Sequence, residues 1–242
     1  MSAFDLTGRR ALVTGANTGI GRAIAVGLAR AGARVVCHGR RSCAETVERI
    51  GEGAEEWIFD LADQAAAAAA LPGDLDILVN NAGIIRRADA LGFPEADWDA
   101  VMAVNLKAVF LLSQAFARAA TGRGAPGRIV NVASLLSFQG GIRVPSYTAS
   151  KHGVAGLTKA LANEWAGQGI NVNAVAPGYV ATSNTEALRA DPERARAILE
   201  RIPAGRWGEP ADIAGAVTFL CTPAANYITG ATLNVDGGWL AR

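Results

Sequence analysis

A tyrosine and a lysine four residues apart, Tyr147 and Lys151, are the side chains in this sequence best suited to proton transfer. Residues at this spacing share one face of an α-helix, so the phenol and the ammonium would be neighbours. A phenol ordinarily has a pKa of about 10, and a nearby cation stabilises phenolate and lowers that pKa. The pair therefore predicts proton exchange during interconversion of an alcohol and a carbonyl. An ordinary surface Tyr and Lys are the alternative, because so short a pattern is common.

A glycine-rich segment, residues 14–21, follows the first apolar run of the chain. Gly15, Gly19 and Gly21 have the spacing Gly-x-x-x-Gly-x-Gly. Glycines permit unusual backbone angles and let N–H groups approach a pyrophosphate at a helix N-terminus. Because the segment follows a strand pattern and precedes an amphipathic helix pattern, it predicts dinucleotide binding. A tight turn without a ligand is the alternative.

The second apolar run ends in Gly39-Arg40-Arg41, with no acidic residue. In a dinucleotide-binding fold the end of this strand meets the adenosine ribose, and an acid there binds both hydroxyls of NAD. A small glycine and two guanidiniums suit a 2′-phosphate instead. We therefore expect NADP(H), with NAD(H) as the alternative if both arginines are solvated. Asp60, after the third run, is expected to meet the adenine amino group or to cap the next helix.

Seven apolar runs that read as buried strands must position these residues. They lie at 11–13, 35–37, 57–59, 77–79, 129–132, 172–175 and 232–235, and helical segments are expected at about 20–31, 43–51, 63–71, 97–120, 148–166 and 210–221. Their alternation predicts parallel βαβ units in a sheet covered on both faces. The predicted fold is one α/β domain with a doubly wound, Rossmann-like sheet of seven parallel strands. Residues 183–205 interrupt the alternation and are expected to form a substrate lid or a surface insertion.

The composition limits the possible partners. The chain has 242 residues, half of them apolar, and a net charge of +1, which gives no electrostatic footprint for nucleic acid or a membrane surface. No apolar run approaches the roughly 20 residues that span a bilayer, and the N-terminus has no secretory pattern. Three cysteines without metal-type spacing and two histidines offer little for a metal site. We therefore expect a cytoplasmic protein without a metal.

Asparagines stand at two further positions of interest. Asn80-Asn81-Ala82-Gly83 ends the fourth run, where small residues let a nucleotide approach and asparagines can brace strand ends. Asn105 lies within an apolar helical segment, and a buried amide needs hydrogen-bond partners. Asn105 is therefore expected either to bend the helix or to belong to a polar network.

Together these residues resemble the short-chain dehydrogenase/reductase family across essentially the whole chain. The resemblance depends on the order and spacing of the turn at 14–21, residues 80–83, Asn105, Ser134, Tyr147, Lys151 and Pro177-Gly178. Each motif alone is weak, but the ordered set is specific. The resemblance implies a sheet of seven parallel strands, an NAD(P)-dependent alcohol–ketone interconversion and a homotetramer.

The resemblance also implies a role for each matching residue. Tyr147 would be the general acid and base, Lys151 would bind the nicotinamide ribose, and Ser134 would hold the substrate oxygen. Asn105 would hold a water that links Lys151 to solvent, and Thr182 would contact the nicotinamide amide. The predicted cofactor contacts are Thr14, Gly15, Asn17, Thr18, Gly19, Ile20, Gly21, Arg40, Arg41, Asp60, Leu61, Asn81, Ala82, Gly83, Tyr147, Lys151, Pro177, Gly178, Val180 and Thr182.

Several further segments resemble a subgroup of the family that acts on keto-deoxy sugar acids. These segments are residues 135–146, 163–166, 202–208 and 235–242. A sugar acid needs a cation for its carboxylate, and Arg143 is the residue expected to supply it. Arg86 and Arg87 are weaker candidates, and all three arginines are alternatively solvated or ion-paired. Gln139 and Asn184 are predicted to contact substrate hydroxyls, beside Ser134 and Tyr147.

Other functions stay open. Gluconate 5-dehydrogenases and other ketone reductases are near neighbours of the subgroup, and the run Gly39-Arg40-Arg41 is unexpected for an NAD-preferring member. A dinucleotide-binding regulator without turnover is the alternative from another class, although the intact Ser134, Tyr147 and Lys151 argue against it. An epimerase or dehydratase of the extended branch of the superfamily would have a different glycine turn and a larger C-terminal domain. The stretch between Asp60 and Asp76 is short for the family, which should only shorten one helix.

Overall fold

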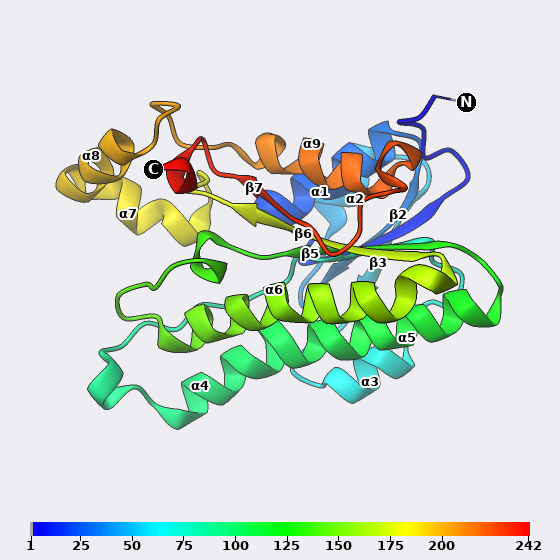
Figure 1. Cartoon of the computed structure of the whole chain (residues 1–242), viewed down its shortest axis with the longest axis horizontal. Helices are drawn as coiled ribbons and strands as arrows, with labels where there is room; N and C mark the ends of the chain where they lie inside the picture. The colour runs from blue at the N-terminus through cyan, green and yellow to red at the C-terminus, as the bar shows by residue number, and fades with distance from the viewer. Residues whose placement is uncertain (1) are drawn as a thin grey trace.

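The computed structural model describes residues 2–242 and places a parallel sheet of seven strands at the centre of the molecule (Figure 1). The strands are β1 (Arg10–Thr14), β2 (Arg34–Gly39), β3 (Ala54–Ile58), β4 (Ile77–Asn80), β5 (Gly127–Val132), β6 (Ile170–Pro177) and β7 (Thr232–Val235). Their order is β3-β2-β1-β4-β5-β6-β7, so the order reverses between β1 and β4. The predicted fold class is thereby confirmed, and the reversal marks where such sheets bind nucleotides.

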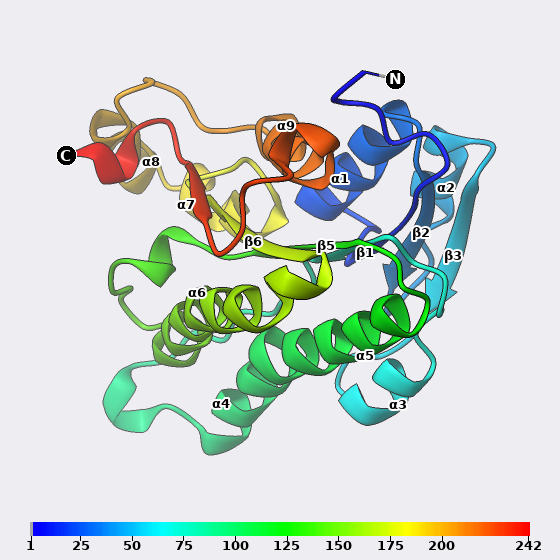
Figure 2. The same cartoon turned by 45° about the vertical axis from the view of Figure 1, so that its right-hand side comes forward.

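Helices cover both faces of the sheet (Figure 2). One layer contains α1 (Gly19–Arg30), α2 (Ala44–Ile50) and α9 (Pro210–Cys221), and the other contains α3 (Gln64–Ala69), α4 (Glu95–Met102), α5 (Ala108–Gly122) and α6 (Pro145–Trp165). Each layer closes its own apolar core against the sheet. The central strands are therefore buried on both faces, which explains why they read as continuous apolar runs. The short α3 fits the expectation of a shortened helix.

A π-helical turn, η2 (Ala103–Lys107), joins α4 and α5 into one continuous helix. This helix, Glu95–Gly122, is long and apolar enough to cross a membrane by length and composition alone. The helix expected at about 97–120 is thereby confirmed, but its apolar length was not recognised from the sequence because Asn105 and Lys107 interrupt its apolar residues. In the structure it packs against α3 and α6, and 44% of its most apolar window is buried.

Residues 183–201 form short helices that cover one end of the molecule beside the C-terminus (Figure 1). They are η5 (Ser183–Thr185), α7 (Glu186–Ala190) and α8 (Pro192–Arg201). Ile198 and Ile202 pack against Trp239 of the C-terminal turn η7 (Trp239–Ala241) and against Leu135. The remaining short turns are η1 (Ala90–Gly92), η3 (Leu135–Ser137), η4 (Ala166–Gln168) and η6 (Pro223–Ala225). The segment thus contacts the chain that follows β5, where the catalytic serine is predicted.

Candidate active site

The structure brings Ser134, Tyr147 and Lys151 together at the carboxyl end of β5. Pro145 begins α6, so Tyr147 and Lys151 lie on its first two turns. The Lys151 ammonium donates a hydrogen bond to the Val132 carbonyl at 2.6 Å and lies 5.5 Å from the centroid of the Tyr147 ring. The Ser134 hydroxyl lies close enough to the phenol of Tyr147 to lower the pKa of that phenol. Three groups able to handle a proton therefore share one site.

The hydroxyl of Ser134 is arranged as a donor. Its Oγ accepts a hydrogen bond from the Leu136 N–H at 3.2 Å, because Ser134 caps the turn η3. With the oxygen engaged as an acceptor, the O–H is left to donate towards the Tyr147 oxygen or a substrate oxygen. The local turn after β5 thus determines the role that this serine can take.

The pKa of Tyr147 differs from the sequence prediction. Burial raises the pKa of the phenol, although the residue keeps some exposed surface, while the Ser134 hydroxyl and the charge of Arg87 act in the opposite direction. Arg87 is the cation that lowers the pKa of Tyr147 in the unliganded protein. Burial also lowers the pKa of Lys151 to about 8, and its ammonium donates to the Val132 carbonyl. Acidification of Tyr147 by Lys151 stays a prediction.

Asn105 lies in the π-helical turn and is 1% exposed. Its Nδ2 donates to the Ile84 carbonyl at 2.9 Å and to Ser150 Oγ at 3.3 Å, and its Oδ1 accepts from the Ile84 N–H at 2.8 Å. The amide therefore ties the segment after β4 to α6. Both expectations from the sequence hold, since Asn105 lies at a helix irregularity and within a polar network. Its contact with a water stays a prediction.

Asn80 has the bracing role that the sequence left open. Its Nδ2 donates to Ser113 Oγ at 3.1 Å and to Asn131 Oδ1 at 2.9 Å, and Asn131 in turn donates to Thr158 Oγ1. These buried side chains join β4 and β5 to α5 and α6 beneath the site. Polar networks of this kind hold their members in one arrangement.

The glycine turn after β1 is shaped for a phosphate. Gly15 and Gly19 have φ of +67° and +54°, and a Cβ on Gly21 would lie 2.1 Å from the Gly15 carbonyl oxygen. Thr18 precedes α1 without a side-chain cap, so the first N–H groups of that helix are left for a ligand. The residues therefore fit the pyrophosphate of a dinucleotide.

The ends of β1 and β4 are joined beside this turn. Thr14 Oγ1 accepts hydrogen bonds from the Asn81 and Ala82 N–H groups at 2.9 and 3.0 Å. Asn81 Nδ2 donates to the Thr14 carbonyl at 2.8 Å. Thr182 lies across from the turn, because a Cβ on Gly19 would be 3.5 Å from its Cγ2. The structure thus brings residues from the predicted phosphate and nicotinamide contacts close together.

The adenosine end is open to solvent at Arg40 and Arg41, both of which are exposed. Within residues 2–242 neither guanidinium forms an ion pair, as a 2′-phosphate site requires. Asp60 Oδ1 accepts from the Ala62 N–H at 2.9 Å, but the residue that caps α3 is Asp63. The expectation that Asp60 caps this helix is therefore wrong. The helix begins at Gln64, so its N-cap is Asp63, three residues after Asp60.

Other predicted cofactor contacts lie along the chain that leaves the sheet. Leu61 is buried, and Val180 pairs with Gly208 in an isolated bridge. Pro177 ends β6, and a Cβ on Gly178 would lie 2.6 Å from the Asp236 Cα, so only a glycine fits there. Close packing against Asp236 therefore explains why position 178 is a glycine, and its predicted contact with the cofactor stays a prediction.

The three arginines near the site have different partners. Arg86 pairs with Asp97 and Arg143 pairs with Asp89, each at 3.1 Å. Arg87 has no carboxylate partner within residues 2–242, and its Nη2 donates to the Asn184 carbonyl at 3.4 Å. The sequence ranked Arg87 below Arg143 because ion pairs over long sequence separations cannot be read from the chain. The only feature of the sequence that indicates that Arg87 lies near the active site is its position shortly after β4.

Gln139 and Asn184 have different partners in the structure. Gln139 Oε1 accepts a hydrogen bond from the indole N–H of Trp239 at 3.2 Å. Asn184 is exposed on η5, and its carbonyl is the acceptor for Arg87. Their predicted contacts with substrate hydroxyls stay predictions.

A family model described as enoyl-(acyl carrier protein) reductase matches residues 15–240. The chain is 53% identical over 251 residues to 2-dehydro-3-deoxy-D-gluconate 5-dehydrogenase of Escherichia coli, covering 100% of this chain and 99% of the relative. The Bacillus subtilis protein of the same name is 52% identical, with 99% and 98% covered. A candidate 2-deoxy-D-gluconate 3-dehydrogenase from Agrobacterium tumefaciens, solved with bound NADP, is 65% identical, with a TM-score of 0.98 and full coverage of both chains. This chain therefore belongs to the short-chain dehydrogenase/reductase family of NAD(P)-dependent oxidoreductases.

Proposed function

We propose that this protein interconverts a secondary alcohol and a ketone on a keto-deoxy sugar acid, as a 2-dehydro-3-deoxy-D-gluconate 5-dehydrogenase or 2-deoxy-D-gluconate 3-dehydrogenase. The observation that carries the proposal is the junction of Ser134, Tyr147 and Lys151 beside a phosphate-binding turn. The names of three relatives, each at least 52% identical over nearly the whole chain, support the sugar-acid substrate. Gluconate 5-dehydrogenase is the second candidate, supported by a Gluconobacter oxydans relative at 45% identity.

The bound nicotinamide nucleotide supplies or accepts the hydride. During reduction, negative charge develops on the substrate oxygen, and the hydroxyls of Ser134 and Tyr147 stabilise it as hydrogen-bond donors. Tyr147 then transfers its phenolic proton to that oxygen and yields the alcohol. Lys151 has three N–H donors, so it can keep the Val132 carbonyl and still hold the nucleotide ribose. Asn105 is proposed to hold the water that returns a proton to Lys151.

The substrate carboxylate is proposed to bind Arg87. This guanidinium is exposed, lacks a carboxylate partner within residues 2–242, and lies close enough to Tyr147 for its charge to lower the phenol pKa. A carboxylate there would lie near the reacting oxygen. Arg143 is the second candidate, because its partner Asp89 is 81% exposed and such a surface ion pair contributes little stability. A substrate carboxylate can therefore replace Asp89 at small cost.

The preferred cofactor is proposed to be NADP(H), held at its 2′-phosphate by Arg40 and Arg41. Both guanidiniums are exposed and free of ion pairs within the described residues. A gluconate 5-dehydrogenase from Burkholderia cenocepacia in complex with NADP and tartrate, 41% identical with a TM-score of 0.93, supports this preference. NAD(H) is the alternative that a direct comparison of the two cofactors decides.

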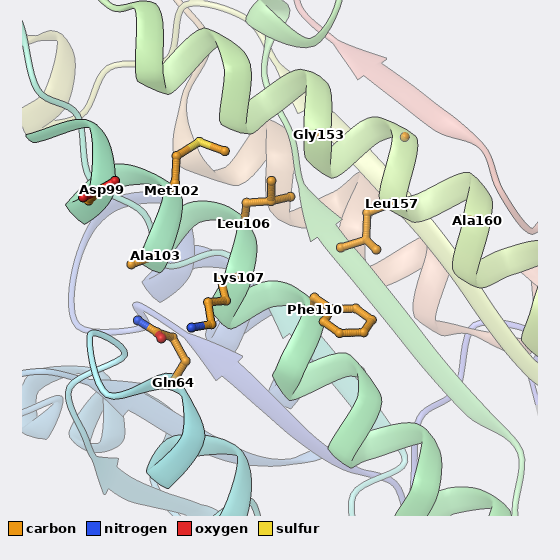
Figure 3. Close-up of a pocket in the computed structure, with 11 residues that line it drawn as sticks. Gln64, Asp99, Met102, Ala103, Leu106, Lys107, Phe110, Gly153, Leu157 and Ala160 are labelled. Carbon is orange, nitrogen blue, oxygen red and sulfur yellow. The ribbon is translucent and has the colours of Figure 1, made fainter. Parts of the chain in front are cut away.

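The oligomeric state is proposed to be a homotetramer, with one interface on the outer face of α5 and α6. The groove on this face has a volume of about 690 Å³. Its apolar lining includes Met102, Leu106, Phe110 and Leu157, as Figure 3 shows. Gly153 lets α6 pack closely against Leu106, since a Cβ there would lie 2.8 Å from Leu106 Cδ2. Apolar side chains that line a groove between helices suit packing against a second copy of the chain.

Two further expectations are kept as proposals. The segment 183–205 is proposed to form a lid over bound substrate, supported by the contact of Arg87 with the Asn184 carbonyl on η5. A cytoplasmic location is supported by three buried cysteines, Cys37, Cys43 and Cys221, all with free thiols.

Steady-state rates test the function directly. The purified protein would be given 2-dehydro-3-deoxy-D-gluconate, D-gluconate and an uncharged secondary alcohol of similar size, each with NADP⁺ and with NAD⁺ as the hydride acceptor. We expect the largest kcat/KM with the keto-deoxy sugar acid and NADP⁺. Cofactor binding without turnover of any substrate would favour a regulatory role, and a preference for the uncharged alcohol would contradict a sugar-acid substrate.

A further inference from the structure

His38 is a buried imidazole on β2 that the chemistry above does not use. The residue is 2% exposed. Its Nδ1 accepts a hydrogen bond from the Gly15 N–H at 3.3 Å, and its Nε2 lies 3.1 Å from the carbonyl oxygen of Phe59. The ring therefore connects the phosphate-binding turn after β1 to the residue that precedes Asp60 after β3. These are the two ends of the predicted adenosine site.

Chemistry allows the ring only one protonation state in this arrangement. A carbonyl oxygen can only accept, so Nε2 carries the proton, and Nδ1 keeps the lone pair that faces the Gly15 N–H. Burial lowers the pKa of His38 to about 4, so the ring is neutral around pH 7. The Trp57 ring, 5.0 Å away between centroids, holds it from the side. The imidazole is thus a rigid neutral link with one donor and one acceptor.

The link determines the orientation of the first peptide of the turn. Gly15 has its N–H bound to His38 and its carbonyl bound by Asn81 Nδ2 at 3.3 Å, so the residue is held on both sides. The Ala16 N–H donates to the His38 carbonyl at 2.8 Å. Both N–H groups therefore point to β2, and the N–H groups further along the turn are left for a phosphate. Gly21 then packs against the Gly15 carbonyl.

We propose that His38 is a positioning residue of the dinucleotide site, which holds the phosphate-binding turn and the end of β3 in their binding arrangement before the cofactor arrives. This proposal rests on the proposed function, since it requires that the turn binds a dinucleotide. Its physical basis is preorganisation, because a turn that is ordered in advance loses less entropy when the ligand binds. His38 touches neither substrate nor reacting atoms in this scheme.

The test compares two substitutions by their dissociation constants for NADPH, measured by fluorescence without substrate. His38→Leu removes both hydrogen bonds, and we expect the Kd to rise about tenfold, with kcat at saturating cofactor within about twofold of wild type. His38→Asn keeps an acceptor near the Nδ1 position, and we expect it to recover most of the lost affinity. An unchanged Kd in His38→Leu would overturn the proposal, as would the same loss of affinity in both variants.

Asn173 supplies a matched control on β6. Its side chain is also buried and makes two hydrogen bonds to backbone groups, with the Ile228 carbonyl at 2.8 Å and the Ala231 N–H at 3.1 Å. We expect Asn173→Leu to lower the melting temperature about as much as His38→Leu while leaving the Kd for NADPH unchanged. If the Kd rises equally in both variants, the effect is general destabilisation and the proposal fails.

Hydrogen exchange of the free protein gives a second measurement, and its wild-type part does not need His38→Leu to fold. The Gly15 amide should be protected in the wild type and should exchange about tenfold faster in a His38→Ala or His38→Leu variant. Wild-type protein that binds no NADPH would contradict the proposed cofactor. Wild-type binding together with an unprotected Gly15 amide would contradict only the role of His38.

Discussion

The Lys151 ammonium donates to the Val132 carbonyl at 2.6 Å, and this bond links the catalytic turn of α6 to the end of β5. The lysine is 5% exposed, so its charge depends on this carbonyl and on the ring of Tyr147 nearby. A buried ammonium with few partners is destabilised relative to its neutral form. The folded protein therefore holds this proton more weakly than the unfolded chain does.

This difference predicts a pH dependence of stability. Burial lowers the pKa of Lys151 from 10.5 to about 8, so between these values the unfolded chain binds a proton that the folded protein has released. Lys151 alone should therefore add about 2 kcal/mol to the free energy of unfolding from about pH 8 to about pH 9.5. The buried cysteines act in the opposite direction, because burial raises their pKa values, so the contribution of Lys151 is the difference between the wild type and a variant without this lysine. Urea unfolding of the free protein near the two pH values measures it. Lys151→Met should lack this rise, and equal rises in both proteins would show that other groups cause it.

Replacing Tyr147 with phenylalanine tests the proton transfer. Tyr147→Phe keeps the ring near Lys151 but removes the group that donates the proton, so kcat should fall roughly 10²- to 10⁴-fold. The Kd for NADPH should stay within about twofold, since no predicted phosphate contact is lost. The exposed Tyr227 offers the same substitution outside the site, and Tyr227→Phe should leave both constants unchanged. Turnover that survives in Tyr147→Phe would assign the proton transfer to another group.

The sheet and the catalytic set could be predicted because their signals are local in the sequence. Buried parallel strands leave continuous apolar runs, and Tyr147 and Lys151 share a helix through their spacing alone. The glycine turn is equally readable, because Gly15 and Gly19 adopt positive φ and Gly21 has no room for a Cβ. In each case the structure requires particular residue types at a few positions that are close together in the sequence.

Features that depend on distant partners could not be predicted in this way. The pKa of Tyr147 depends on burial, on Ser134 and on Arg87, which lies sixty residues earlier in the chain. The pairing of Arg143 with Asp89, fifty-four residues apart, is likewise not readable from the sequence. The π-helical turn around Asn105 likewise accompanies hydrogen bonds to Ile84, which no helical pattern indicates.

The unpaired state of Arg87 predicts which arginine recognises the sugar acid. Arg87→Ala should raise KM for a keto-deoxy sugar acid at least about tenfold, because a charge-assisted hydrogen bond is lost. KM for an uncharged ketone should change little. Arg86→Ala is the matched control, since Arg86 is paired with Asp97. A large effect of Arg143→Ala with no effect of Arg87→Ala would assign the carboxylate to Arg143 instead.

The exposed pair Arg40 and Arg41 predicts the cofactor preference. Replacing both with alanine should raise the Kd for NADPH about tenfold or more, because two guanidiniums that meet the 2′-phosphate are removed. The Kd for NADH should stay within about twofold, and added salt should weaken NADPH binding to the wild type more than to the variant. Fluorescence titration with each cofactor measures both. Equal increases in the Kd for NADPH and for NADH would mean that the arginines support the fold of the site and do not bind the 2′-phosphate.

The C-terminal turn predicts a contribution to substrate binding through Gln139. Trp239 donates its indole N–H to Gln139 Oε1 at 3.2 Å, and the guanidinium carbon of Arg201 on α8 lies 4.1 Å from the centroid of its ring. The bond to Oε1 fixes the orientation of the Gln139 amide, so that its N–H groups are placed to donate to a substrate oxygen. Trp239→Phe keeps an aromatic ring for Arg201 but frees Gln139, so KM for the sugar acid should rise by about threefold to tenfold with little change in kcat. Gln139→Leu should produce a similar rise, and the double variant should add nothing further if the two residues act as one unit. Additive effects would show that Trp239 acts by packing against α8 and not by orienting Gln139.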